Sequence, residues 1–322
     1  MDSPFKSPAI LSLCPGMRGL ESGIELIIGK VRTLAYVEIE AYIIENLVQQ
    51  MEKSILDAAP VWSNVKTFRE VAHLFRGKVH GITGGYPCQP FSNAGKRGGV
   101  EDPRHLYPYI EEIIRIIGPH WCFFENVPGH LSLGYRDVRL SLERLGYKVE
   151  EGIFSAEEVG APHIRKRLFI LAMDDSAIRR YRAEKDEICA RRNPAFNAGE
   201  FIPNAERQRL EIGEVESNGN EQPAFKRVCG ELADPYLWWQ QRGDYTGMGW
   251  NEKPFPFPAR PGEPQRWYEP CRTLESRMGY VINGYSYRED LLRMAGNAVV
   301  PQSAALAFYT LLNKHYEKAT QQ

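Results

Sequence analysis

The sequence predicts an α/β fold built around a mostly parallel sheet. In the first half of the chain, short apolar runs alternate with amphipathic stretches, which is the signature of βαβ units. The composition agrees, because 43% hydrophobic and 25% charged residues are close to the average for soluble globular proteins. This composition excludes disordered, fibrous and coiled-coil proteins, and 322 residues allow one large domain or two.

The elements of this fold follow one another along the first 173 residues. Short apolar runs predict buried strands at 9–13, 34–39, 79–83, 121–124 and 148–154, and the very apolar run 168–173 ends the series. Amphipathic stretches between them predict helices at 20–28, 43–58, 106–117 and about 139–146. The helix at 106–117 has the clearest pattern, since Ile110, Ile113 and Ile117 recur at helical spacing. The strand at 79–83 stops at Gly84-Gly85.

The character of the sequence changes after Met173. Residues 179–192 are dense in charge, 193–221 are polar, and 253–264 contain five prolines. This texture indicates a small domain or insertion rich in loops over roughly 175–270, with four packing anchors at Trp238, Trp239, Trp250 and Trp267. A helical C-terminus follows, with an apolar face formed by Ala304, Leu306, Ala307, Leu311 and Leu312.

Membrane, disulfide and zinc-binding classes are disfavoured. No apolar stretch approaches the ~18 residues of a membrane helix, and Pro4 and Pro8 interrupt the only segment that resembles a secretion signal. We therefore expect a cytoplasmic protein without a membrane partner. Six cysteines without a CxxC pair argue against a disulfide framework and a structural zinc site, so we expect no metal. A net charge of −1 leaves nucleic-acid binding open, since local basic clusters suffice for it.

The most informative segment runs from 84 to 92 and contains Cys88 directly after a predicted strand. The carboxyl end of a parallel strand is where α/β folds place their sites. Glycine and proline on both sides hold the thiol on a rigid turn, which favours a nucleophile over a buried cysteine that acts as a small hydrophobe. A thiol with a pKa near ~8.5 needs a neighbouring cation to react, and the candidates are Lys96, Arg97 and Arg165.

Three short motifs occur in order: Pro87-Cys88-Gln89, Phe124-Glu125-Asn126-Val127 and Arg165-Lys166-Arg167. Their order and spacing resemble those of the cytosine-C5 DNA methyltransferases of bacteria and phages. The resemblance covers about 10–173 and resumes over about 284–308. It implies a Rossmann-like, AdoMet-dependent methyltransferase fold with a mixed sheet, in which 1–174 and 284–322 form the catalytic domain. The segment 175–283 then forms a smaller, loop-rich target-recognition domain.

The resemblance also implies roles for the site residues. Cys88 is the thiolate that adds to carbon 6 of cytosine, which makes carbon 5 nucleophilic. Glu125 hydrogen-bonds N3 and the exocyclic amine and so stabilises the adduct. Arg165 lies beside O2 of the base, and Arg167 is its partner in the arginine pattern. The base must first leave the duplex stack, and the expected DNA contacts come from Gln89, Ser92, Lys96 and Arg97.

The implied methyl donor is S-adenosylmethionine, with S-adenosylhomocysteine as its product. Glycines in the first strand-to-helix turn allow close backbone approach to this ligand. Glu38 is expected to bind the ribose hydroxyls, Ile39 to lie against the adenine, and Asn64 to replace an aspartate that contacts the adenine amine in the family. The predicted donor-binding residues are Cys14, Gly16, Met17, Arg18, Gly19, Glu38, Ile39, Asn64, Val65, Pro87, Leu106, Asn297 and Val299.

Three positions depart from the family pattern. Cys14 stands where an aromatic residue is usual, and Arg18 stands where glycine is common. A cation at Arg18 either strengthens binding of the donor carboxylate or favours a modified donor with an extra acid group. His163 replaces a common glutamine, and we expect little change because both side chains donate hydrogen bonds.

The leading hypothesis is a monomeric enzyme that forms 5-methylcytosine in double-stranded DNA. It is either the modifying half of a restriction system, whose cognate endonuclease is encoded separately, or a solitary enzyme. Candidate phosphate and guanine contacts in the middle region are Arg179, Arg180, Arg182, Arg191, Arg192, Arg207 and Arg209. One alternative is a non-catalytic DNA-binding regulator on the same scaffold. Another is a nicotinamide-dependent dehydrogenase, which explains Glu38 but gives no reason for Pro87-Cys88-Gln89.

Overall fold

The computed structural model describes residues 3–87, 106–159, 161, 164–191 and 298–320. Several predicted site residues lie outside these ranges: Cys88, Gln89, Ser92, Lys96, Arg97, His163 and Asn297. Most of the predicted target-recognition domain also lies outside the described residues. The predicted catalytic domain is described over 3–87, 106–159, 161, 164–174 and 298–320.

Within the described residues, the core is a seven-stranded sheet in the order β3-β2-β1-β4-β5-β7-β6. The strands are β1 (Ala9–Leu13), β2 (Arg32–Val37), β3 (Val61–Trp62), β4 (Gly81–Gly84), β5 (Trp121–Asn126), β6 (Lys148–Phe154) and β7 (Arg167–Met173). β1 to β5 pair in parallel, whereas β7 is antiparallel to both β5 and β6. The α/β class with a mixed sheet, predicted from the sequence, is therefore confirmed.

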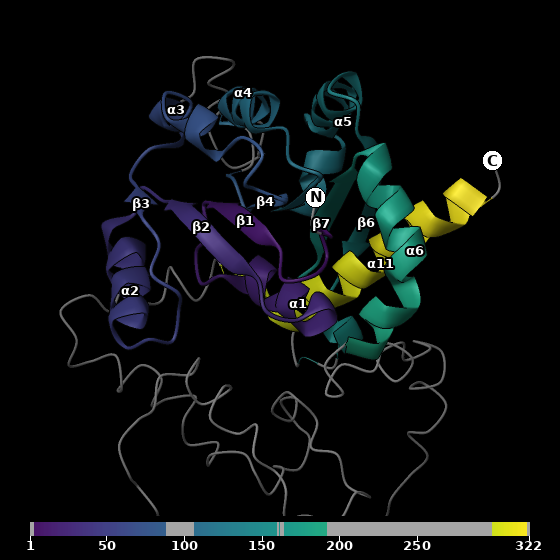
Figure 1. Ribbon diagram of the computed structural model, residues 1–322, viewed down its shortest axis with the longest axis horizontal. Helices are drawn as coiled ribbons and strands as arrows, with labels where there is room; N and C mark the ends of the chain where they lie inside the picture. The colour runs from purple at the N-terminus through teal and green to yellow at the C-terminus, as the bar shows by residue number, and fades with distance from the viewer. Residues whose placement is uncertain (1–2, 88–105, 160, 162–163, 192–297, 321–322) are drawn as a thin grey trace, which may run out of the picture. The chain divides into compact units, whose positions relative to one another are not determined.

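Helices cover both faces of the sheet (Figure 1). One face carries α1 (Gly19–Ile28), α6 (Asp175–Arg191) and α11 (Pro301–Thr320), and the other carries α3 (Val65–Phe68), α4 (Tyr107–Ile117) and α5 (Tyr135–Arg144). β5 shows how the core divides, because Trp121 and Phe123 pack toward α1 and α11 while Cys122 and Phe124 pack toward α4 and α5. A strand buried on both faces must be apolar throughout, which explains the continuous apolar runs.

Two glycines on α1 bring the end of the described chain against its beginning. A Cβ atom on Gly19 would overlap the carbonyl of Val299, and one on Gly23 would lie 2.6 Å from the Cβ of Ala304. These positions lie four residues apart on one side of α1, so together they form a groove that α11 fills. The close approach explains how residues near 300 return to a core that begins with β1.

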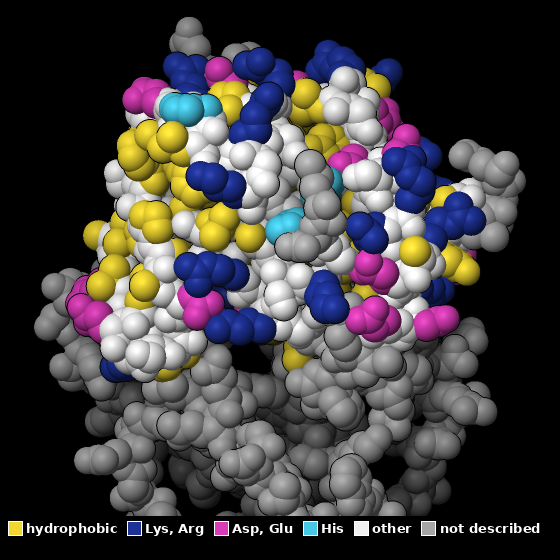
Figure 2. Space-filling model, viewed as in Figure 1, with side chains coloured by type: hydrophobic (Ala, Val, Ile, Leu, Met, Phe, Trp, Pro, Cys, Tyr) yellow, Lys and Arg dark blue, Asp and Glu magenta, His cyan; other side chains and the backbone are white. Residues whose placement is uncertain are grey.

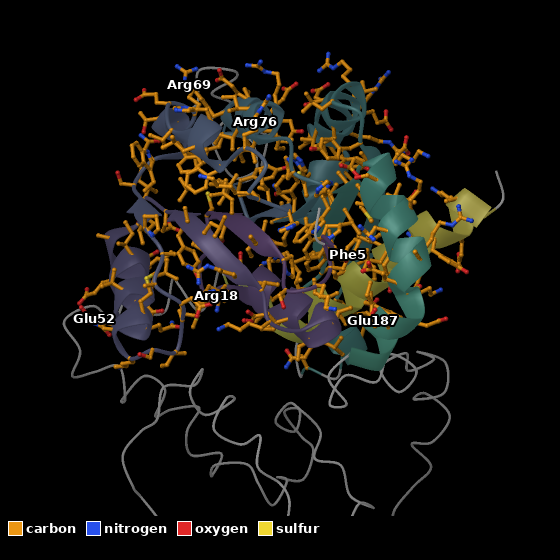
Figure 3. The ribbon with its side chains drawn as sticks, in the orientation of Figure 1. Phe5, Arg18, Glu52, Arg69, Arg76 and Glu187 are labelled. Atoms are coloured by element: carbon orange, nitrogen blue, oxygen red, sulfur yellow. The ribbon has the colours of Figure 1, made fainter. Side chains whose placement is uncertain are left out.

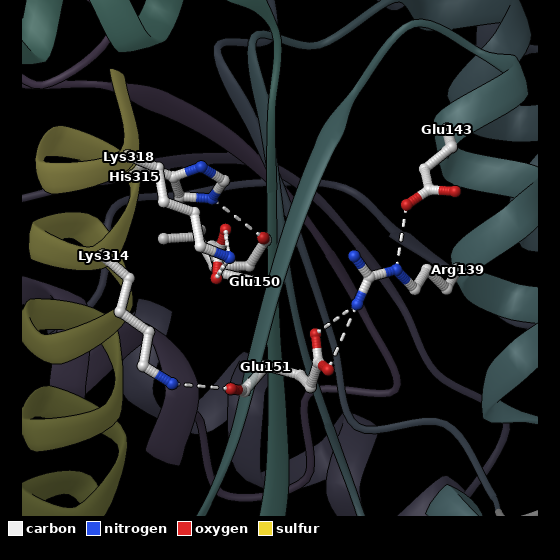
Figure 4. A network of polar contacts seen from close by, with 8 residues as sticks. Arg139, Glu143, Glu150, Glu151, Lys314, His315 and Lys318 are labelled. Atoms are coloured by element: carbon white, nitrogen blue, oxygen red, sulfur yellow. Dashed lines mark hydrogen bonds and ion pairs between the residues drawn. The ribbon is translucent and has the colours of Figure 1, made fainter. Parts of the chain in front are cut away.

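Polar contacts also hold α11 on the edge strand β6 (Figure 4). Lys318 Nζ lies 2.7 Å from Glu150 Oε1, and Lys314 Nζ donates to the carbonyl of Glu151 at 3.0 Å. The buried His315 ring donates through Nε2 to the carbonyl of Leu171 at 3.1 Å. The Glu151 carboxylate turns away from α11, toward Arg139 on α5, because successive side chains on a strand face opposite sides.

Several elements have other bounds than the sequence predicted, among them β2 (34–39 expected), β4 (79–83 expected) and α5 (about 139–146 expected), and two helices differ most. α2 (Ala41–Glu52) ends before 58, because the chain turns at Ser54, whose φ of 57° is incompatible with a continuing helix. α6 is a 17-residue helix in the charge-dense stretch, and its Ala177, Ile178 and Tyr181 are buried in the core. The helix that opens the predicted recognition segment 175–283 therefore packs with the catalytic core.

No helix among the described residues combines the length and the apolar character needed to cross a membrane.

Candidate active site

The predicted site residues that the structure describes gather at one edge of the sheet. Cys14 follows β1, Glu38 follows β2, Pro87 lies three residues after β4, and Glu125 is near the end of β5. These four strands are neighbours in the order β2-β1-β4-β5 and run in parallel, so their carboxyl ends meet at the same edge. This is the edge at which open α/β sheets bind ligands.

Glu125 and Arg167 form an ion pair across β5 and β7. Glu125 pairs with Phe169 in the antiparallel register, so Arg167, two residues earlier, presents its side chain on the same face. Arg167 Nε lies 2.9 Å from Glu125 Oε1, and the side chains are 22% and 12% exposed. Burial raises the pKa of the Glu125 carboxyl, and the positive charges of Arg167 and Arg165 oppose this shift. A carboxyl in this setting is suited to hold or share a proton with a bound base.

Arg165 joins the same cluster from the loop before β7. Its backbone has a φ of 36°, and Nη2 donates a 2.6 Å hydrogen bond to the carbonyl of Ala298. Burial lowers the pKa of its guanidinium, as does the charge of Arg167, while Glu125 acts in the opposite direction. The structure therefore brings Glu125, Arg165 and Arg167 together and links them to the chain return at Ala298.

The backbone leading to Cys88 is anchored beside Glu125. A Cβ atom on Gly85 would lie 3.6 Å from Glu125 Oε2, which places the end of β4 against this carboxyl. Asn126 Nδ2 donates to the carbonyl of Tyr86 at 3.2 Å. The Tyr86 ring is buried against Phe124, Tyr107 and His130. Asn126 thus fixes the residue before Pro87.

Sequence reasoning gave Asn126 no separate role. The signal was its place between Glu125 and Val127 at the end of a predicted strand, where a side-chain amide is able to bridge to the next strand. His130 was also missed. It is fully buried, its Nε2 lies 3.5 Å from the Tyr86 hydroxyl, and burial lowers the pKa of its ring.

The glycine turn between β1 and α1 has an unusual backbone. Cys14, Gly16 and Arg18 all have positive φ, near 51°, 51° and 58°. The Cys14 N–H donates to the carbonyl of Val37 at 2.8 Å, which ties the turn to the end of β2. Burial and the neighbouring Glu38 raise the pKa of the Cys14 thiol to about 12, which disfavours its reactive thiolate form.

Glu38 is held in place directly after β2. Its Oε1 accepts from the backbone N–H groups of Ile39 at 2.8 Å and of Glu40 at 3.0 Å, and Gly16 N–H contributes a further hydrogen bond. Burial raises its pKa despite these donors. Ile39 beside it is 68% exposed, an unusual exposure for an isoleucine at the end of a buried strand.

The other predicted donor-binding residues occupy several positions around this edge. Asn64 Oδ1 accepts from Lys66 N–H at 2.9 Å and caps α3, so its amide has a structural role. Val65 is buried, Leu106 lies just before α4, and Met17 packs beside Tyr36. Contact of these residues with a ligand stays a prediction.

Arg18 is buried beneath β2, between α1 and α2 (Figure 3). Its Nη2 lies 3.6 Å from Glu25 Oε1. Burial raises the pKa of Glu25, and Arg18 opposes this shift. The guanidinium therefore has an acidic partner within the protein, and no extra acid group on the donor is needed to compensate it.

Basic side chains on the described surface are interspersed with acidic ones. Figure 2 shows Lys and Arg along the upper part of this face, over α3, α4 and α5, with Asp and Glu among them. Arg69 pairs with Glu112 at 3.0 Å, and Arg144 with Glu111 at 4.0 Å. On α6, Arg180 pairs with Glu184 at 3.6 Å. Among the described residues, no three His, Cys, Asp or Glu side chains are grouped to hold a metal ion.

Comparison with known proteins gives consistent matches. The family model for C-5 cytosine-specific DNA methylase matches residues 9–226. The type II methyltransferase M.NaeI from Lentzea aerocolonigenes is 30% identical over 176 residues, which are 53% of this chain and 41% of that protein. M.MspI from Moraxella sp is 38% identical over 98 residues, covering 28% and 23%. The chain thus spans less than half the length of these curated relatives.

Solved structures with a related arrangement include two further proteins. One is a putative DNA modification methyltransferase encoded within a prophage of E. coli, with 26% identity, coverage of 53% of this chain and 47% of that chain, and a TM-score of 0.43. The other is a mutant of DNMT2 from Spodoptera frugiperda, with 22% identity, coverage of 52% and 50%, and a TM-score of 0.43.

Proposed function

Because the chain belongs to the C-5 cytosine-specific DNA methylase family, we propose that it transfers a methyl group from S-adenosylmethionine to carbon 5 of cytosine in double-stranded DNA. The observation that carries this proposal is the cluster of Glu125, Arg165 and Arg167 beside the backbone that leads to Cys88. A carboxyl and two guanidinium groups at one strand edge, next to the backbone that leads to Cys88, suit the activation of a pyrimidine ring.

In the proposed reaction, the Cys88 thiolate bonds to carbon 6 of the ring, and the displaced electron pair makes carbon 5 nucleophilic. Glu125 hydrogen-bonds N3 and the exocyclic amine, where the ring gains negative charge. A raised pKa favours this role, since a carboxyl that keeps its proton is able to donate it. After methylation, a base such as water takes the carbon 5 proton, and the electron pair of that C–H bond forms the C5–C6 double bond, expels the thiolate from carbon 6 and restores the aromatic ring.

The two arginines act on different partners. Arg167 holds Glu125 in one orientation through their 2.9 Å contact. Arg165 lies beside the O2 side of the base and favours the thiolate form of Cys88 through its charge. Its 2.6 Å hydrogen bond to the Ala298 carbonyl supports this role, because it restricts the position of the guanidinium.

The residues at the ends of β1 and β2 fit the proposed donor. Two backbone N–H groups hold Glu38 Oε1, which orients the carboxyl for a ribose diol, and the exposed Ile39 beside it suits an adenine face. The close approach at Gly19 brings Val299 to the same turn. When bound, S-adenosylmethionine supplies an electrophilic methyl group on its sulfonium.

The substrate cytosine must rotate out of the duplex to reach this edge, since carbon 6 is inaccessible in a stacked base pair. Gln89, Ser92, Lys96 and Arg97 are the proposed DNA contacts, and the sequence-recognition part is proposed to begin after α6. The relatives' names as type II methyltransferases support a partner restriction endonuclease.

The test uses tritiated S-adenosylmethionine and mixed-sequence double-stranded DNA. The proposal expects label in 5-methylcytosine, and DNA that contains 5-fluorocytosine should trap a covalent adduct. Cys88→Ser should abolish the adduct while DNA binding persists. DNA binding without any label transfer by the native chain would instead identify a non-catalytic regulator.

A further inference from the structure

Glu21 is a buried carboxyl with only half of its hydrogen-bonding capacity used. It lies in the first turn of α1 and is 1% exposed. Its Oε1 accepts from Ser12 Oγ on β1 and from Thr83 Oγ1 on β4, both at 2.6 Å. Its buried Oε2 has no hydrogen-bond partner among the described residues. A buried carboxylate oxygen in this state lacks the compensation that burial normally requires.

The position of Glu21 is defined by its two hydroxyl partners. Ser12 and Thr83 are each the last residue but one of their strand, and β1 and β4 are neighbours in the centre of the sheet. The carboxyl therefore lies just below the ligand-binding edge. In the order β2-β1-β4-β5, it lies between Glu38 after β2 and Glu125 on β5.

This position matches one part of the proposed methyl donor. The inference rests on the proposed function, in which Glu38 binds the ribose and Glu125 binds the target base. The donor must then extend from the end of β2 toward β5, so its methionine portion crosses the ends of β1 and β4. That portion carries an α-ammonium group, which is both a cation and an N–H donor.

We propose that Glu21 Oε2 accepts a hydrogen bond from the α-ammonium group of S-adenosylmethionine. The sulfonium carries no N–H, so it cannot satisfy this acceptor, whereas an ammonium satisfies both the oxygen and the charge. The nearby Arg18 guanidinium lies 3.6 Å from Glu25, so it has an acidic partner other than Glu21. Glu21 is thus a donor-specificity residue of this chain.

The competing explanation is purely structural: Glu21 only ties β1, β4 and α1 together. The substitution Glu21→Gln separates the two, because its amide oxygen still accepts both hydroxyl hydrogen bonds. It removes the negative charge and the second acceptor while keeping the shape of the side chain. Glu52→Gln on the exposed end of α2 is the matched control, since it removes a carboxylate that contacts neither strand.

The experiment measures dissociation constants by isothermal titration calorimetry with the full chain. The ligands are S-adenosylmethionine, S-adenosylhomocysteine and 5′-methylthioadenosine, of which the last lacks the amino-acid portion. Glu21→Gln should weaken the first two by roughly tenfold to a hundredfold, the range of a charge-assisted hydrogen bond, and leave the third unchanged. Glu52→Gln should change none of them.

Three results would overturn the assignment: unchanged affinities, equal weakening of all three ligands, or weakening of S-adenosylmethionine alone, which would point to the sulfonium. If the native chain binds none of the ligands, the proposed function fails rather than the role of Glu21 within it.

If circular dichroism shows that Glu21→Gln does not fold, Glu21→Asp takes its place. It keeps the charge but shortens the reach, so loss of the two amino-acid ligands with 5′-methylthioadenosine retained supports the proposal, and any other pattern contradicts it.

Discussion

Arg167 Nε lies 2.9 Å from Glu125 Oε1, and the two residues come from antiparallel neighbours in a sheet that is otherwise largely parallel. The reversal of β7 is what makes this contact possible, because it brings the start of one strand beside the end of the other. A parallel β7 would place its first residue at the opposite edge of the sheet. The antiparallel pair therefore carries the guanidinium to the carboxyl.

Arg167→Ala should lower the catalytic rate by about tenfold or more, because Glu125 loses the partner that orients it. Arg167 also opposes the burial that raises the Glu125 pKa, so its removal should raise that pKa further. A pH–rate profile should show the Glu125 ionisation at higher pH in the variant. Arg139→Ala, which removes an arginine paired with Glu143 and Glu151, is the control. An unshifted profile in Arg167→Ala would argue that Glu125 does not titrate in catalysis.

Asn126→Ala should slow the reaction by up to about a hundredfold, because it releases the Tyr86 carbonyl and the backbone that leads to the nucleophile. The affinity for S-adenosylmethionine should stay close to that of the native chain. Rapid-quench measurement of adduct formation with 5-fluorocytosine DNA tests the first expectation, and calorimetry tests the second. Equal loss of donor affinity would mean that Asn126 supports the whole edge rather than the nucleophile segment.

Gly23→Ala should destabilise the fold by about 1–3 kcal/mol, because the added methyl group meets Ala304 and the carbonyl of Pro301. The sign is informative, since replacing glycine by alanine inside a helix normally stabilises it by about 0.5–1 kcal/mol. Urea unfolding measures the difference. Gly129→Ala is the control, because open space surrounds its Cβ position. A gain in stability for Gly23→Ala would show that α1 and α11 pack less closely.

The stability of the fold should fall as pH drops through the ordinary histidine pKa of about 6.5. Burial lowers the pKa of His315, and Lys318 and Lys148 act in the same direction while Glu150 and the Leu171 carbonyl oppose them. The unfolded chain then binds a proton that the folded chain does not, which favours unfolding below that pH. His315→Gln should reduce the slope of unfolding free energy between about pH 7 and 5.5. A slope in His315→Gln identical to that of the native chain would remove His315 as the cause.

The strands were the most predictable part of the fold. β1 and β6 have the bounds expected from the sequence, because a strand covered on both faces is apolar throughout its length. α6 was missed because its dense charges hide Ala177, Tyr181 and Ile188, which recur at helical spacing on one side. The charged residues of α6 occupy its exposed face, whereas only a few apolar positions on the opposite face pack into the core. The overall charge density of the segment therefore did not reveal the helix.

The contacts within the candidate site were harder to predict than the grouping of its residues, and the catalytic roles of those residues stay predictions. The motifs identified Glu125, Arg165 and Arg167, and the structure brings these three together. The link from Asn126 to Tyr86 and the clamp of Glu21 with Ser12 and Thr83 both depend on which strands are neighbours. Glu21 lies in the first turn of α1, where an acidic side chain commonly stabilises a helix through the helix dipole. From the sequence alone, its position therefore indicated no other role.

The groove that Gly19 and Gly23 form on α1 has a consequence for biosynthesis. The apolar side of α1, with Leu20, Ile24 and Ile27, emerges early from the ribosome, but residues 301–320 that cover it are translated far later. Until then this side of α1 lacks the apolar partners that bury it in the folded protein. The hydrophobic core shared by α1 and α11 is therefore complete only after residues 301–320 have been translated.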